Sequence, residues 1–223
     1  MRDEPRSAAL AREAIVSRRI GVLSVVLAAA VVGLVAAAGA GAGAAKPVVA
    51  RATFAGGCFW CMEPPFEKIP GVASVTSGYT GGQKVNPSYE EVSAGGTGHA
   101  ESVDIVYDPA KITYSQLLDV FWHNVDPLQA DGQFCDHGHQ YRTAIFYHDA
   151  EQKKLAEESK EKVQARLGKP VVTEIVAASR FYPAEEYHQD FYRKSPVRYY
   201  TYRAGCGRDR RLKELWGADA GGH

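Results

Sequence analysis

The chain has 223 residues and a formal net charge of zero, with 45% hydrophobic and 10% aromatic residues. This composition supplies a hydrophobic core and excludes wholesale disorder, and the balanced charge without a long basic block excludes a nucleic-acid binder. Four cysteines are too few for a disulfide-scaffold miniprotein, and a chain of this length can form a stable core without disulfides. The length corresponds to one domain, or to one domain plus a tail.

The first 45 residues read as a targeting segment. Residues 20–45 contain no charged side chain and follow Arg18 and Arg19. A positive flank, an apolar run and small residues at Ala42 and Ala44 predict an export signal, and the paired arginines resemble a twin-arginine signal. The run is also long enough to be a retained membrane anchor. Either alternative places the catalytic domain, residues 46–223, outside the cytoplasm, in the periplasm or anchored on the extracytoplasmic side, where paired thiols need a dedicated electron donor.

The first half of the domain alternates predicted strands and a helix. Residues 48–57 form a predicted strand that ends in paired glycines, and residues 71–82 begin as a strand and finish in a glycine-rich loop. Residues 99–109 alternate polar and apolar side chains before an Asp-Pro stop, which is typical of a strand. Residues 113–125 carry apolar side chains at helical spacing, with Thr113 as the predicted N-cap.

The second half continues the alternation. Residues 142–149 form a predicted strand, and residues 149–168 form a predicted amphipathic helix with Asp149 as its N-cap and Gly168 at its end. Residues 170–179 are the last predicted strand.

Interleaved strands and helices predict an α+β fold: a two-layer sandwich with a mainly antiparallel, ferredoxin-like sheet and helices on one face. Beyond residue 181 the chain is rich in Tyr, Arg and Gly, so we expect an irregular C-terminal coat with short helices such as residues 208–217.

Two cysteines three apart, Cys58 and Cys61, follow the first predicted strand in "GGCFWCME". A thiol in a turn before a helix can be activated, because free backbone N–H groups stabilise the thiolate. Pro64 and Pro65 disfavour a helix that starts at Phe59, because proline lacks the N–H and clashes with the preceding turn. We therefore expect the helix to begin between residues 61 and 63.

Five motifs in this order resemble the A-type peptide methionine sulfoxide reductases: "GCFWCME", "GYTGG", "NPSYEEV", "GTGHAESVDIVYDP" and "DHGHQYRTAIF". The resemblance covers residues 52–216. It implies thiol-dependent reduction of the S epimer of methionine sulfoxide, free or in proteins, as repair of oxidative damage.

The resemblance also implies residue roles. Cys58 matches the nucleophile that becomes a sulfenic acid, and Glu101 matches the proton donor. Phe59 and Trp60 match the aromatic seat for the substrate methyl group. The polar residues that face the sulfoxide oxygen and the substrate backbone are matched by Tyr89, Asp136 and Tyr141.

Without the resemblance, these residues have ordinary interpretations. A glutamate in an alternating strand, such as Glu101, is by default a solvated outer-face residue. Phe59 and Trp60 would be core or interface aromatics, Tyr89 and Tyr141 half-buried tyrosines, and Asp136 a turn residue.

A second thiol must condense with the sulfenic acid so that a thioredoxin-like dithiol donor can regenerate the enzyme. Cys206 is our first choice for this resolving cysteine, because its flanking glycines make a segment able to swing to Cys58. Cys61 is the alternative, although a CxxC pair can be strained. Cys135 is expected to be a buried, passive thiol. The chemistry implies no bound cofactor or metal, and we expect a monomer.

Two other functions fit parts of the pattern. An exported CxxC thiol–disulfide oxidoreductase would use Cys58 and Cys61, but its long helix conflicts with the two prolines. A zinc-binding module would combine Cys58 and Cys61 with two ligands from Cys135, His137 and His139. The 74-residue gap between the two halves is unlike compact zinc folds.

Overall fold

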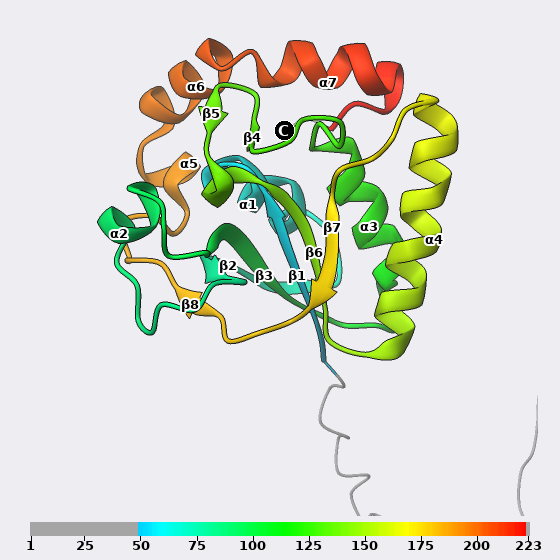
Figure 1. Ribbon diagram of the computed structural model, residues 1–223, viewed down its shortest axis with the longest axis horizontal. Helices are drawn as coiled ribbons and strands as arrows, with labels where there is room; N and C mark the ends of the chain where they lie inside the picture. The colour runs from blue at the N-terminus through cyan, green and yellow to red at the C-terminus, as the bar shows by residue number, and fades with distance from the viewer. Residues whose placement is uncertain (1–48, 222–223) are drawn as a thin grey trace, which may run out of the picture. The chain divides into compact units, whose positions relative to one another are not determined.

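A sheet of six strands forms the centre of the computed structural model, which describes residues 49–221 (Figure 1). Neighbouring strands are antiparallel, except β6 and β7, which pair in parallel. The predicted α+β class with a mainly antiparallel sheet is therefore confirmed. The predicted leader, residues 1–45, lies outside the described residues. In spatial order the strands are β7 (Glu174–Ala177), β6 (Thr143–Tyr147), β1 (Ala50–Gly56), β3 (Ala100–Tyr107), β2 (Val72–Thr80) and β8 (Tyr182–Pro183).

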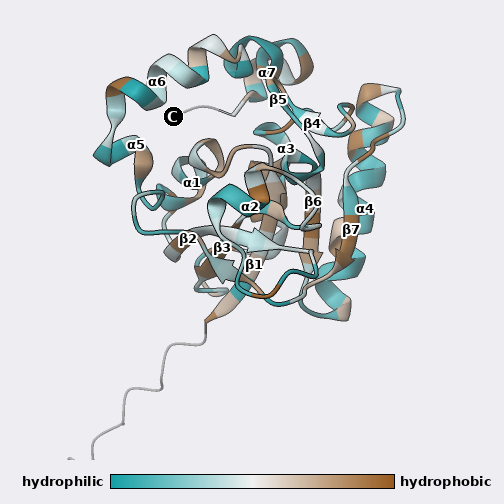
Figure 2. Ribbon diagram, turned by 60° about the vertical axis from the view of Figure 1, so that its left-hand side comes forward, coloured by the Kyte–Doolittle hydropathy of each residue, from teal (hydrophilic) through white to brown (hydrophobic). Residues whose placement is uncertain are grey.

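The hydrophobic core lies between the central strands and the helices that pack on them. Phe54 of β1 stacks on Phe66 at 5.6 Å and on Phe121 at 5.1 Å between ring centroids. Phe66 belongs to helix α1 (Phe59–Glu67) and Phe121 to helix α3 (Tyr114–His123). The longest helix, α4 (Ala150–Leu167), packs on β6 and β7, and Figure 2 shows its largely hydrophilic colouring.

Local capping signals set the ends of α3 and α4 as predicted. The Thr113 hydroxyl accepts a hydrogen bond from the Gln116 N–H at 3.2 Å in a capping box. The Asp149 carboxylate accepts one from the Gln152 N–H at 2.8 Å. Gly168 ends α4 in the left-handed conformation, with φ of 62°.

The predicted start of α1 is wrong. The helix begins at Phe59, with Cys58 as its N-cap and Pro64 and Pro65 inside it. An interior proline costs a helix about 3 kcal/mol. Burial of Phe59, Met62 and Phe66, each at most 1% exposed, returns about 1.5–3 kcal/mol per side chain and offsets this penalty. Tertiary packing therefore overrides the local helix-breaking signal.

The C-terminal segment that we expected to be an irregular coat is mostly helical. In Figure 1, helices α6 and α7 cross the end of the sheet at which β4 and β5 lie. Within residues 49–221, each helix is too short or too polar to cross a membrane. The remaining elements are α2 (Tyr89–Ser93), β4 (Gly132–Gln133), β5 (Asp136–His137), a 3-10 turn (His139–Tyr141), α5 (Phe191–Lys194), α6 (Pro196–Gly205), α7 (Arg208–Trp216) and a final 3-10 turn (Gly217–Asp219).

A substitution at Gly57, in the turn between β1 and α1, tests how tightly this turn is packed. Its φ is 81°, and a Cβ added there would lie 2.5 Å from the Cβ of Gln133. We expect Gly57→Ala to lower the free energy of unfolding by about 2–5 kcal/mol, the sum of a left-handed backbone penalty and overpacking. Gly168→Ala is the matched control, because Gly168 also has positive φ but meets no atom within 4 Å. Urea unfolding should show a loss of only about 1 kcal/mol for the control, and equal losses would contradict the packing argument.

Candidate active site

The turn between β1 and α1 carries the predicted nucleophile. Cys58 has extended backbone angles, φ −54° and ψ 120°, which end the strand and open the helix. The Arg208 guanidinium fixes the turn from the opposite end of the chain, donating to the Gly56 carbonyl at 2.7 Å and to the Asn124 carbonyl at 2.9 Å. Arg208 is only 2% exposed. Nothing local in the sequence marks it as a site residue, since its partners lie 84 and 152 residues away.

Cys58 and Cys61 form a buried pair of free thiols, 7% and 1% exposed. Burial raises the pKa of Cys58, and its hydrogen bond to Cys61 raises it further. The same hydrogen bond, helped by the nearby guanidinium groups of Arg208 and Arg203, lowers the pKa of Cys61 to about 6. The pair therefore carries one negative charge near neutral pH, with the Cys58 proton directed at the Cys61 sulfur.

Glu101 lies beside this pair on the inner face of β3. It is 2% exposed, so its default interpretation as a solvated outer-face residue is wrong. Alternation along the strand places Glu101 on the same face as the buried Val103 and Ile105. Its carboxylate accepts a hydrogen bond from the Phe59 N–H at 3.1 Å. Burial nevertheless raises the pKa of Glu101 to about 8, so the carboxyl group holds a proton at neutral pH.

The two aromatic residues after Cys58 differ in their surroundings. The Phe59 ring is buried and lies 5.9 Å from the Tyr79 ring. The Trp60 ring is half-buried and stacks on Phe191 of α5, with centroids 3.6 Å apart and planes 7° apart. The Tyr202 ring of α6 lies edge-on to Trp60, with ring centroids 5.9 Å apart. The aromatic cluster at the start of α1 is therefore completed by the C-terminal helices.

His188 is a site residue that the sequence interpretation missed. It is 1% exposed, and its Nδ1 accepts a hydrogen bond from the Trp60 indole N–H at 3.0 Å. Its ring lies 5.0 Å from Phe59 and 4.4 Å from Tyr89. Burial lowers the pKa of His188, which favours the neutral ring that this hydrogen bond requires. A histidine between Tyr187 and Gln189 carries no local signal for such a role.

The three predicted polar residues gather around the same site from different elements. Tyr89 begins α2, Asp136 begins β5 and Tyr141 ends the 3-10 turn that follows β5. Burial raises the pKa of Tyr89 to about 12, and the charges of Glu101 and Cys58 act in the same direction. Burial and the Glu101 charge also raise the pKa of Tyr141. The Tyr202 hydroxyl donates a hydrogen bond to the Asp136 carboxylate.

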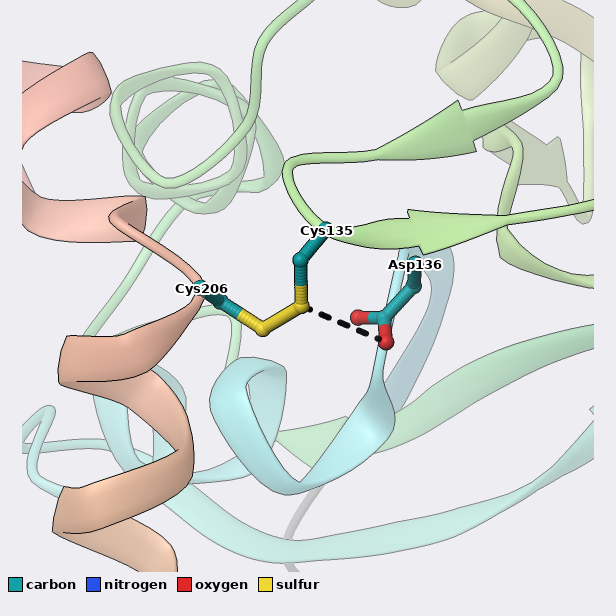
Figure 3. Close-up of side chains that lie close together, drawn as sticks. All are labelled: Cys135, Asp136 and Cys206. Carbon is teal, nitrogen blue, oxygen red and sulfur yellow. Dashed lines mark hydrogen bonds between the residues drawn. A yellow bond between two sulfur atoms is a disulfide. The ribbon is translucent and has the colours of Figure 1, made fainter.

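Cys135 and Cys206 form a disulfide with their Cα atoms 4.8 Å apart (Figure 3). The expectation that Cys135 is a buried, passive thiol is therefore wrong, and its side chain is exposed. Cys135 lies in the turn between β4 and β5, directly after Phe134, whose φ is 59°. Cys206, our first choice as resolving cysteine, is bonded to Cys135 in this state rather than free.

The disulfide removes Cys135 from the candidate ligands of the zinc alternative. Among the described residues, Cys135 lies with Cys206 and Asp136, not with Cys58 and Cys61. Both Cys135 and Cys206 sulfurs are consumed in the disulfide.

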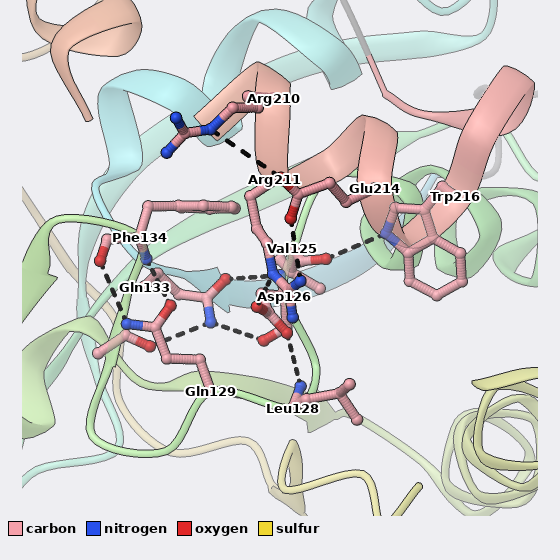
Figure 4. Close-up of polar contacts among 11 residues, drawn as sticks. Val125, Asp126, Leu128, Gln129, Gln133, Phe134, Arg210, Arg211, Glu214 and Trp216 are labelled. Carbon is pink, nitrogen blue, oxygen red and sulfur yellow. Dashed lines mark hydrogen bonds and ion pairs between the residues drawn. The ribbon is translucent and has the colours of Figure 1, made fainter. Parts of the chain in front are cut away.

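A network of buried polar groups holds the segments on either side of this disulfide (Figure 4). The Gln133 side-chain amide bonds both to the Asp126 N–H, at 2.8 Å, and to the Asp126 carbonyl, at 2.7 Å. The Arg211 guanidinium of α7 pairs with the Asp126 carboxylate at 2.7 Å. The β4 hairpin and α7 are therefore fixed to the same loop after α3.

The chain is similar to known proteins. A sequence model of the family "Peptide methionine sulfoxide reductase" matches residues 50–220. The peptide methionine sulfoxide reductase MsrA of Bacillus licheniformis is 54% identical over 168 residues, which cover 74% of this chain and 93% of that protein. MsrA of Bacillus subtilis is 53% identical over 169 residues, covering 75% and 96%.

Two solved structures are similar in fold. The reduced form of Mxr1 from Saccharomyces cerevisiae has a TM-score of 0.65 at 32% identity, covering 68% of this chain and 88% of that one. Methionine sulfoxide reductase A of Corynebacterium diphtheriae has a TM-score of 0.62 at 32% identity, covering 68% and 77%. The alternative of a CxxC thiol–disulfide oxidoreductase is not favoured. The chain belongs to the peptide methionine sulfoxide reductase family, A type, and reduces the S epimer of methionine sulfoxide to methionine with electrons from thiols.

Proposed function

We propose that Cys58 attacks the sulfoxide sulfur and that Glu101 donates the proton that the oxygen needs. The observation that carries this assignment is the Glu101 carboxyl group, buried, bonded to the Phe59 N–H beside Cys58, and with a pKa raised to about 8. A carboxyl group that is protonated at neutral pH suits general acid catalysis.

The Cys61 thiolate, which accepts the Cys58 hydrogen bond, is the base for the nucleophile. As the Cys58 sulfur bonds to the substrate sulfur, its proton passes to Cys61. Glu101 protonates the sulfoxide oxygen. The oxygen ends on the Cys58 sulfur as a sulfenic acid, and methionine leaves with the electron pair.

The Trp60 ring, together with Phe59, forms the apolar surface on which the substrate methyl group rests. The stacking of Trp60 on Phe191 and its hydrogen bond to His188 support this role, because they hold the indole in one orientation. Tyr89, Asp136 and Tyr141 supply hydroxyl and carboxyl groups toward the oxygen and the substrate backbone, a role supported by the electrostatic influence of Glu101 on both tyrosines.

Cys61 is assigned as the cysteine that resolves the sulfenic acid, in place of Cys206. Its sulfur already lies within hydrogen-bond reach of Cys58, whereas Cys206 is bonded to Cys135. Condensation of the Cys61 thiol with the sulfenic acid forms the Cys58–Cys61 disulfide and releases one water.

A single-turnover experiment on a double variant, Cys135→Ser with Cys206→Ser, tests these assignments. The reduced full-length protein is mixed with each epimer of methionine sulfoxide without added reductant, then alkylated and analysed by mass spectrometry. We expect one methionine per chain from the S epimer and a Cys58–Cys61 disulfide. A persistent sulfenic acid on Cys58 would remove Cys61 from the resolving role, and no methionine would remove Cys58 as nucleophile.

The sequence also supports a location and an electron donor for this reaction. The uncharged run after Arg18 and Arg19 supports export of the protein, with this segment either cleaved or retained as a membrane anchor. The exported protein would act as a monomer that repairs oxidised proteins. A thioredoxin-like dithiol outside the cytoplasm would supply its electrons. The strand order β6-β1-β3-β2 with helices between supports a ferredoxin-like, two-layer arrangement for the central part.

A further inference from the structure

Helix α6 presents a buried arginine to the thiol pair at the start of α1. Tyr199 and Arg203 stand four residues apart on α6, so they lie on one face of the helix, and they are 0% and 1% exposed. Tyr199 and Cys61 belong to the same buried cluster. Arg203 lies close enough to Cys61 for its charge to lower the pKa of that thiol. A full positive charge is therefore buried beside Cys61.

The ion pair that Arg203 makes within the described residues satisfies only part of its guanidinium group. The Nε of Arg203 donates to the Asp209 carboxylate at 2.9 Å, and its Nη2 donates to the same carboxylate oxygen. The Asp209 side chain is 59% exposed, so water screens its attraction for the buried charge. Among the described residues, the buried Nη1 of Arg203 has no hydrogen-bond partner. A buried guanidinium in this state is costly unless a second negative group approaches it.

Cys61 supplies that second group when it is ionised. The hydrogen bond from Cys58 lowers the pKa of Cys61 to about 6, and the charges of Arg208 and Arg203 act in the same direction, against burial. Conversely, the pKa of Arg203 is raised although burial opposes it, and Cys61 is the first of the groups that raise it. Arg208 is already occupied, because its guanidinium donates to two backbone carbonyls. Arg203 is therefore the cation with an N–H group to spare for the Cys61 thiolate.

Oxidation of the thiol pair removes this negative charge. The Cys58–Cys61 disulfide is neutral, so Arg203 would keep only the screened Asp209 carboxylate among the described residues. The other titratable groups on which the Cys61 charge acts include Glu101, Tyr199 and Tyr202, whose pKa values are all raised, so they hold their protons near neutral pH. They cannot replace the lost charge. The reduced pair, with Cys61 ionised, is therefore stabilised relative to the disulfide.

We propose that Arg203 is a positioning residue that acts through Cys61, and that it makes the Cys58–Cys61 disulfide easy to reduce by holding the Cys61 thiolate. A CxxC disulfide is a stronger oxidant when its reduced form is stabilised. This inference rests on the proposed role of Cys61, because each turnover then ends with this disulfide. Arg203 thereby favours the return of the enzyme to its active, reduced form.

The step on which Arg203 acts is a thiol–disulfide exchange. The thiolate of an external dithiol attacks Cys58, the more exposed of the two sulfurs. The Cys58–Cys61 bond breaks, and Cys61 leaves with the electron pair as a thiolate beside Arg203. The second thiol of the donor then attacks its own partner in the mixed disulfide. The donor becomes a disulfide, Cys58 is released and takes one of the two donor protons, and the other proton goes to water.

Equilibration with glutathione redox buffers tests the proposal. The full-length protein carries Cys135→Ser and Cys206→Ser, so that Cys58 and Cys61 form its remaining couple, and acid quenching, alkylation and mass spectrometry give the ratio of disulfide to dithiol. Arg203→Met should raise this ratio at least about tenfold at a given buffer composition, which is a midpoint potential about 30 mV lower. Arg203→Lys retains the positive charge and should restore most of the difference.

Asp209→Asn is the matched control, because it breaks the same ion pair but leaves the guanidinium in place. Cys61 then becomes the main counter-charge of Arg203, so the ratio of disulfide to dithiol should stay the same or fall. A structural role of the Arg203–Asp209 pair would instead move both variants in one direction. Asp209 is exposed, so this control remains informative if Arg203→Met does not fold.

Three results would overturn the inference: an unchanged ratio in Arg203→Met, an equal rise in Asp209→Asn, or no Cys58–Cys61 disulfide in oxidised glutathione. Failure of the proposed role of Cys61 has a different signature. In that case one turnover with methionine (S)-sulfoxide leaves a persistent sulfenic acid on Cys58, whereas the glutathione equilibrium still differs between Arg203→Met and its background.

Discussion

Cys58→Ser will form no methionine with dithiothreitol as the electron donor, a loss on the order of 10⁴-fold or more. A serine hydroxyl is not ionised near neutral pH, and oxygen cannot accept the sulfoxide oxygen as sulfur does when it becomes a sulfenic acid. Serine and cysteine side chains have similar volumes, so we expect the variant to keep its fold. Methionine release measured by chromatography, with thermal unfolding to verify folding, is the decisive comparison.

Cys61→Ser is the matched control for that result, because it removes the neighbouring buried thiol. In the Cys135→Ser, Cys206→Ser background we expect this variant to form one methionine per chain, more slowly than the background protein, since Cys58 keeps its sulfur but loses the thiolate that takes its proton. A sulfenic acid probe should then label Cys58. Residual turnover by Cys58→Ser, or labelling of another cysteine, would contradict the assignment of the nucleophile.

Glu101→Gln will lower kcat/KM by about 10²–10⁴-fold at neutral pH, the usual contribution of a general acid. The pKa of Glu101 is raised to about 8, so its proton is present below that pH and is lost above it. A rate that needs the protonated form therefore falls as the pH rises through about 8. On the acid side of the profile, the rate rises as the pH passes the Cys61 pKa of about 6 and the thiol pair ionises. The variant should lose the alkaline limb and keep the acid one.

Glu63→Gln provides the control for the pH profile. Glu63 is 1% exposed, and burial raises its pKa to about 7, but its carboxylate accepts from the Asp190 N–H rather than facing the thiols. Both limbs should persist in this variant. If the Glu101→Gln profile keeps its decline near pH 8, the proton comes from another group around the site.

The elements that could be predicted are those whose signals are local. Thr113 and Asp149 cap their helices because a side-chain oxygen reaches an N–H three residues ahead. Strand alternation likewise predicted β3, but it did not predict that Glu101 is buried, which the default interpretation of a solvated residue had wrong. The start of α1 could not be predicted, because the burial of Phe59, Met62 and Phe66 that stabilises it comes from other elements.

The site residues also differ in whether a sequence signal could reveal them. Motif resemblance identified Cys58, Glu101 and the residues that the structure gathers around them. Local patterns did not reveal His188 or Arg208, whose partners Trp60 and Gly56 lie 128 and 152 residues away. The bond between Cys135 and Cys206 joins residues 71 positions apart, and sequence alone cannot pair four cysteines.

The burial of Cys61 has a consequence for synthesis. Its apolar neighbours include Phe191, Tyr192 and Tyr199, which all lie far beyond Cys61 in the chain. Both thiols of "CFWC" therefore leave the ribosome well before the residues that cover Cys61 are made. A nascent chain that stops short of Phe191 would carry this thiol pair without that apolar cover.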